Sequence, residues 1–168
     1  MNKKLNNMWS DPNVGFHFIA KVIDPVGSIT LGPKIGLGES DAKFSEISGL
    51  EVDLQTEEIL EGGENRFTYQ APSSIKYSPL VLKRGKTNQN SELASWCSRT
   101  FENGLIRVEL KHIVISLLNE HGLPVNAWIC EHAYPKSWKV STFNSMENNI
   151  VFESMEFVYR KFQVIPLL

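Results

Sequence analysis

Apolar and polar positions alternate in several segments of the chain, and this two-residue period predicts β-strands. Residues 15–24 show it clearly, because Phe16, Phe18 and Val22 fall on one face of an extended chain. The strands predicted in this way cover residues 15–24, 44–60, 78–84, 105–118, 125–133 and 149–164. Pro135 follows the fifth of them and is expected to end it, because proline cannot donate to a strand ladder.

The second half of segment 44–60 has one apolar face and one polar face. The apolar face carries Leu50, Val52 and Leu54, and the polar face carries Glu51, Asp53 and Gln55. Further carboxylates follow at Glu57, Glu58, Glu61 and Glu64. A catalytic carboxylate pair needs two desolvated groups with unequal pKa values, whereas a row of acids on one strand is typical of a solvated face. We interpret these residues as a wet surface, facing either bulk water or an enclosed channel.

One segment, residues 91–103, has the period of an α-helix. Ser91 is placed to cap it, since a serine hydroxyl accepts a hydrogen bond from an amide of the first turn. Gly104 suits the left-handed residue that follows a helix. The side chains expected to face the core are Leu93, Trp96, Cys97, Thr100 and Phe101, and the outer face carries Glu92, Ser95, Arg99 and Glu102. About six strands and one helix predict a mainly β (α+β) protein, a β-barrel or sandwich with the helix packed on it.

Length and composition are those of a globular protein with one domain. The chain has 168 residues, of which 42% are hydrophobic, and its formal net charge of −2 leaves no basic excess to bind nucleic acid. We expect residues 1–14 to form a flexible arm and residues 15–168 a single domain with a long Gly- and Pro-rich loop at 25–43. No apolar run approaches the roughly 18 residues of a membrane-spanning helix, and no signal peptide is recognisable. Cys97 and Cys130 form no CxxC pair and are expected to be buried, reduced thiols.

Three short motifs suggest reactive sites, but none is complete. Gly-Lys-Thr at residues 85–87 ends like a phosphate-binding loop but lacks the glycine that this motif needs five residues earlier. Cys130 and His132 would share one strand face, and two ligands do not make a metal site. His112 and Ser116 lack the strained turn that presents a nucleophilic serine. We therefore predict no catalytic, cofactor-binding or metal-ligating residues, and no enzymatic activity.

Three longer segments are more distinctive. The first is FSEISGLEV at residues 44–52, which continues to EGGEN at residues 61–65. The second is KYSPLVLKRG at residues 76–85, and the third runs from VISLLNE at residues 114–120 to AYP at residues 133–135. Together and in this order they resemble the tube protein family of contractile tails, which includes the T-even phage tail tube and its relatives in extracellular contractile injection particles.

This resemblance implies a structural inner-tube subunit with a tail-tube or Hcp-like fold that forms hexameric rings. The rings would stack into a hollow tube, with a sheath outside and cargo or DNA in the lumen without sequence-specific binding. The implied partners are other copies of the chain, the sheath protein, baseplate or hub proteins and tube terminators, with no cofactor and no membrane insertion. Assembly in the bacterial cytoplasm is expected, as part of a phage tail or a released phage-tail-like particle.

The same resemblance suggests roles for exposed residues. The lumen-facing candidates are Glu51, Asp53 and Gln55; the ring–ring contact candidates are Gly62, Gly63, Glu64 and Asn65; the sheath-facing candidates are Glu92, Arg99 and Glu102. Two alternatives stay open. One is a tube-initiating, baseplate-proximal or tube-terminal paralogue of the same machine, and the other is a secreted ring-forming effector or cargo chaperone.

Overall fold

The computed structural model describes residues 17–25, 42–59, 68–85, 91–102, 106–142 and 151–165. The predicted arm 1–14, nearly all of the predicted loop 25–43 and the ring–ring candidates Gly62, Gly63, Glu64 and Asn65 lie outside these residues. The described part of the chain contains ten strands and one helix, so the expected class is confirmed and the expected number of strands was too low. The elements are β1 (His17–Ile23), β2 (Ala42–Phe44), β3 (Glu46–Ser48), β4 (Val52–Ile59), β5 (Tyr69–Tyr77), β6 (Leu80–Gly85), α1 (Glu92–Glu102), β7 (Lys111–Leu118), β8 (Pro124–Val140), β9 (Phe152–Val158) and β10 (Lys161–Ile165).

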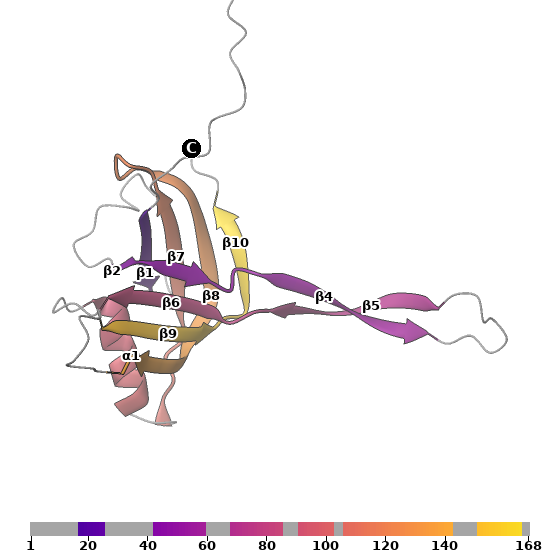
Figure 1. Cartoon of the computed structure of the whole chain (residues 1–168). Helices are drawn as coiled ribbons and strands as arrows, with labels where there is room; N and C mark the ends of the chain where they lie inside the picture. The colour runs from indigo at the N-terminus through magenta and orange to yellow at the C-terminus, as the bar shows by residue number, and fades with distance from the viewer. Residues whose placement is uncertain are drawn as a thin grey trace, which may run out of the picture.

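Eight of the strands form one antiparallel sheet in the order β2-β1-β7-β8-β9-β6-β3, with β10 beside β8. Strand β8 joins the two halves of this sheet. The first part of β8 pairs with β7 and β10, and its second part pairs with β9. It is 17 residues long and curves strongly (Figure 1). The sheet therefore bends over a central core as an open sandwich, and the described strands do not close into a barrel.

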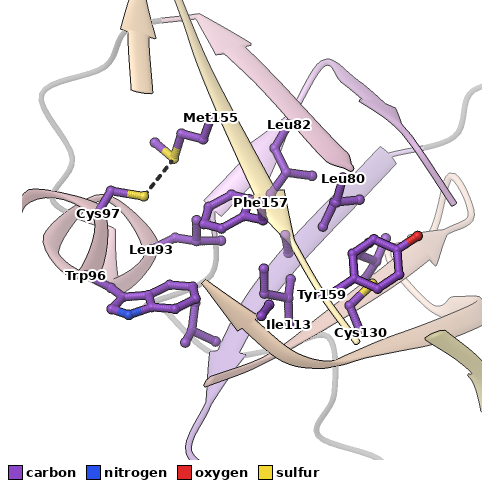
Figure 2. Packing of buried hydrophobic residues seen from close by; sticks show 14 of the residues in the cluster. Leu80, Leu82, Leu93, Trp96, Cys97, Ile113, Cys130, Met155, Phe157 and Tyr159 are labelled. Carbon is purple, nitrogen blue, oxygen red and sulfur yellow. Dashed lines mark hydrogen bonds between the residues drawn. The ribbon is translucent and has the colours of Figure 1, made fainter. Parts of the chain in front are cut away.

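The core lies between the two halves of the sheet and α1. Trp96 stacks on Phe157 with ring centroids 5.5 Å apart, and Leu93 and Cys97 are fully buried beside them (Figure 2). The helix begins as expected, since the backbone amide of Ala94 donates to Oγ of Ser91 at 3.2 Å.

One residue of the predicted helical stripe is not buried. Phe101 is 44% exposed, whereas Thr100 before it is buried. The last turn of α1 extends beyond the sheet (Figure 1), so the periodicity identified the correct face but not where the core ends.

Two strand boundaries differ from the prediction at prolines and turns. Strand β8 continues through Pro135 to Val140, because a register shift between Pro135 and Ser137 marks an irregularity at which the missing amide is tolerated. The predicted strand 149–164 is two strands, β9 and β10. They separate at Arg160, whose amide donates to the carbonyl of Glu131 at 2.9 Å.

Strand β7 begins later than expected. The prediction placed its start at residue 105, but pairing starts at Lys111. Residues 106–110 precede it outside any strand, with all five side chains exposed.

Candidate assembly surfaces

Strands β4 and β5 form a two-stranded ribbon that is not part of the main sheet. It projects far from the body (Figure 1), and every residue of β4 is exposed. Its root is anchored by aromatic rings: Tyr77 packs against Tyr159 and Phe162, each at a centroid distance of 5.8 Å. The hydroxyl of Tyr159 donates to the carbonyl of Gly49 at 2.7 Å, and burial raises the pKa of that hydroxyl. The ribbon is therefore fixed to the body at its base and exposed along its length.

The two faces of this ribbon differ in chemistry. Val52 and Leu54 lie on one face, and Leu54 is paired with Ile75, so we call these three side chains the apolar ribbon face. They are 52%, 61% and 61% exposed, respectively. Asp53 and Gln55 lie on the opposite, polar ribbon face and are exposed. The sequence correctly separated the two faces, but in the single chain neither is covered.

The expected lumen-facing set is thus brought together at one place. Glu51, Asp53 and Gln55 lie at the root and on the first half of β4, all exposed. Glu51 also accepts a hydrogen bond from the hydroxyl of Ser78 at 3.1 Å. Strand β5, which completes this surface, was missed, because its sequence from Tyr69 to Tyr77 contains Pro72 and two serines and lacks sustained alternation.

The expected sheath-facing residues lie on α1. Glu92, Arg99 and Glu102 are all exposed, and Nε of Arg99 donates to the carbonyl of Ser95 at 3.3 Å. Arg99 also lines a small surface notch of about 50 Å³ between α1 and residues 107–109. All three side chains of this set are therefore open to solvent.

A buried polar cluster fixes α1 to the sheet. Nε of Arg84 donates to the carboxylate of Glu153 at 2.8 Å, and Nε1 of Trp138 donates to the same carboxylate at 2.6 Å. A second guanidinium nitrogen of Arg84 donates to Oγ of the helix cap Ser91 at 3.0 Å. The guanidinium carbon also lies 5.7 Å from the ring centroid of Phe44. Arg84, Ser91 and Glu153 are buried and linked by these hydrogen bonds through Arg84, so they form a structural cluster.

The histidines, cysteines and Ser116 that suggested reactive chemistry do not form a reactive site, and Lys86 and Thr87 lie outside the described residues. A bulge in β8 pairs Cys130 with Ile113 and Ala133 with Lys111, so Cys130 and His132 do not share one face as a regular strand would require. His132 has a φ of 51°, and its backbone amide donates to Nδ1 of His112 at 3.0 Å.

Burial explains the titration behaviour of these groups. It lowers the pKa of His112, and the neighbouring His132 lowers it further. Burial also raises the pKa of both Cys97 and Cys130 to about 12, so neither is a ready nucleophile. Ser116 is 2% exposed and out of reach of a substrate.

Among the described residues, no group of three or more His, Cys, Asp and Glu side chains is arranged to hold a metal ion. The described helix is also too short to cross a bilayer.

One protein family matches most of the chain. The family model for the T4-like virus tail tube protein gp19 matches residues 14–163. No curated protein sequence matches the chain.

Among solved structures, a chain of the 6-fold symmetrised anti-feeding prophage baseplate is 27% identical, covers 94% of this chain and 97% of that chain, and has a TM-score of 0.72. A chain of the sheath–tube complex of the extracellular contractile injection system PVC, in its extended state, is 23% identical over 93% of both chains, with a TM-score of 0.70. Hcp1 from Flavobacterium johnsoniae is 15% identical over 88% of this chain and 93% of that chain, with a TM-score of 0.53. The last two likenesses establish a common fold.

Proposed function

Because the chain belongs to the T4-like virus tail tube protein gp19 family, we propose that it is the structural inner-tube subunit of a contractile injection system. It would form hexameric rings that stack into a tube. The family match over residues 14–163 carries this proposal. The 6-fold symmetry of the anti-feeding prophage baseplate, which contains a similar chain, supports the ring.

The exposed ribbon supplies a physical means of association. A long two-stranded ribbon with an uncovered apolar face is unfavourable in water and promotes pairing with another chain. When the apolar ribbon face of Val52, Leu54 and Ile75 is covered by another copy, the polar ribbon face of Asp53 and Gln55 is left to line the lumen. This arrangement would give a tube wall with one packed side and one wet side.

The other contacts of the tube are assigned to the remaining candidate positions. The ring–ring contact would involve Gly62, Gly63, Glu64 and Asn65, which connect β4 to β5. The sheath contact would involve Glu92, Arg99 and Glu102 on α1, through weak surface charge pairs. Baseplate and terminator proteins would bind the tube ends, and cargo or DNA would pass through the lumen without sequence-specific contacts. Assembly in the bacterial cytoplasm and a purely structural, non-enzymatic role complete the proposal.

Electron microscopy of the purified protein tests this function. We expect negatively stained rings with six-fold symmetry and a central hole, alone or stacked. Leu54→Asp, on the apolar ribbon face, should abolish them, because association would then bury a carboxylate. Gln55→Asp, the neighbouring change on the polar ribbon face, should leave them intact. A wild-type protein that stays monomeric at high concentration would refute the proposal.

A second candidate is a paralogue at one end of the tube. The 27% identity to a chain of a baseplate structure favours it. Immunogold labelling of intact particles distinguishes the two, since a main tube subunit would be labelled along the whole length of tubes stripped of sheath. An end-specific paralogue would be labelled at one end only.

A further inference from the structure

Strand β8 changes its neighbours at a bulge that contains two histidines. Glu131 and His132 of β8 lie opposite the single residue His112 of β7. Such an extra residue bends its strand and interrupts the ladder. From Tyr134 onward, β8 pairs with β9 and no longer with β7. The bulge therefore lies where this long, curved strand passes from one half of the sheet to the other (Figure 1).

One hydrogen bond across the bulge depends on the protonation of His112. The backbone amide of His132 donates to Nδ1 of His112 at 3.0 Å. This nitrogen must therefore carry no proton, and the single N–H of the neutral ring lies on Nε2. His132 itself has a φ of 51°, in the left-handed region, which is unfavourable for a residue with a side chain. The hydrogen bond thus helps to hold a backbone conformation that His132 would otherwise leave.

The surroundings of the two rings disfavour a positive charge. The rings meet edge to face with their centroids 5.0 Å apart, and His112 is 7% exposed. Nδ1 of His132 is buried and has no hydrogen-bond partner among the described residues. Burial lowers the pKa of His112, and the neighbouring His132 lowers it further, whereas Glu131 acts in the opposite direction.

The other charged groups near the bulge only partly offset this effect. In the described part of the chain they are Glu131 on β8, Lys161 on β10, Arg160 before it, Lys111 on β7, Lys21 on β1 and Asp24 after it. Lys111 is bonded to Asp24 at 2.8 Å, and Lys161 lies 3.4 Å from a carboxylate oxygen of Glu131. Both carboxylates therefore already have a cationic partner. The titratable groups of Cys130 and Tyr159 belong to the main core cluster.

We propose that His112 and His132 form an acid-operated latch at the bend of β8. The latch is closed while His112 is neutral and accepts the amide of His132. Because Nε2 already carries a proton, a second proton on His112 must go to Nδ1, which then points one donor at another, and the hydrogen bond is lost. His132 can then leave its left-handed conformation, and the bend between the two halves of the sheet is released. The latch acts within one subunit and does not depend on how copies associate.

Hydrogen exchange of the full-length chain at different pH values tests the latch. The rates are corrected for the intrinsic pH dependence of exchange, and the reporting peptides cover residues 131–134. In the wild type their protection should fall at least about fivefold between about pH 7.5 and pH 5, because the open form binds a proton more tightly than the closed form. His112→Asn keeps an acceptor oxygen close to the position of Nδ1 but does not titrate, so protection should change by less than about twofold.

His121→Asn is the matched control. The side chain of His121, in the turn between β7 and β8, is 74% exposed, so this variant should keep the wild-type dependence on pH. Peptides from β6 and β9 report on opening of the whole domain and should stay protected at pH 5.

Three results would overturn the latch. The first is wild-type protection at residues 131–134 that does not change with pH, and the second is a fall in His112→Asn as large as in the wild type. The third is an equal fall in β6 and β9, which would show that acid opens the whole domain and not the bend alone. The tube function is tested separately by microscopy and stands or falls independently of these results.

Discussion

The buried ion pair between Arg84 and Glu153 allows a quantitative test of what holds α1 to the sheet. Glu153 is 1% exposed and accepts hydrogen bonds from Arg84 and Trp138. Replacing Arg84 with methionine would remove the guanidinium that pairs with this buried carboxylate. Removing one partner of such a pair destabilises a protein by about 3–5 kcal/mol. The cap itself should survive, because Ser91 still accepts the amide of Ala94.

Removing both charges should be milder than removing one. In the double variant Arg84→Met/Glu153→Met neither charge of this pair remains, and hydrophobic replacement of a buried pair is often neutral or stabilising. We therefore expect the double variant to be more stable than Arg84→Met alone by at least about 1.5 kcal/mol.

Urea unfolding followed by tryptophan fluorescence measures Arg84→Met, Glu153→Met and the double variant, at protein concentrations at which the chain is monomeric. Lys83→Met is the matched control. Lys83 is the preceding residue, and its 2.9 Å ion pair with Glu46 is exposed on both sides, so its loss should cost no more than about 1 kcal/mol. An Arg84→Met variant within about 1 kcal/mol of wild type, or a double variant as unstable as the sum of the two single changes, would refute this account.

Three further predictions follow from single residues. Gly49→Ala should lower the free energy of unfolding by about 2–3 kcal/mol in urea titrations. The reason is that Gly49 has a φ of 93° and that a Cβ there would lie 1.9 Å from the carbonyl oxygen of Pro79. A variant as stable as wild type would contradict this prediction. Cys97 and Cys130 should not react with a thiol reagent at pH 8 in the native protein and should both react in urea, since burial raises the pKa of each to about 12; rapid native labelling would contradict it. His112 has a lowered pKa in the folded state, so below about pH 6.5 the unfolded chain binds more protons and the free energy of unfolding should fall as the pH falls. His112→Gln should reduce the dependence of the free energy of unfolding on pH between pH 7 and 5. An unchanged dependence would assign it to other groups.

Local features of the fold could be predicted from the sequence. The helix, its cap and its buried face could be predicted because they depend on residues that are close together in the sequence. These residues are Ser91, Leu93, Trp96 and Cys97. The alternation at Val52 and Leu54 likewise separated the two faces of β4. Features that depend on distant partners could not be predicted.

The bulge and the strand ends show this limit. The shift at His132 depends on the register between β7 and β8, and nothing adjacent to His132 in the sequence signals it. Pro135 looks like a strand terminator, but β8 continues through it, because the register between β8 and β9 shifts between Pro135 and Ser137. The late start of β7 at Lys111 has the same origin, since Ile106 and Val108 have strand propensity but no neighbouring strand in the described fold.

The apolar ribbon face is a different kind of mismatch between sequence and single-chain structure. Alternation predicts a packed side for Val52 and Leu54, yet both are more than half exposed. Fully burying such a side chain is worth roughly 1.5–3 kcal/mol, so three of them uncovered, including Ile75, represent stabilisation that the single chain does not realise. In a protein that works as a monomer, polar residues at these positions would increase solubility, because exposed ribbon edges and apolar faces promote aggregation. The pattern therefore matches the assembled state better than the monomer, and the covering surface must come from another chain.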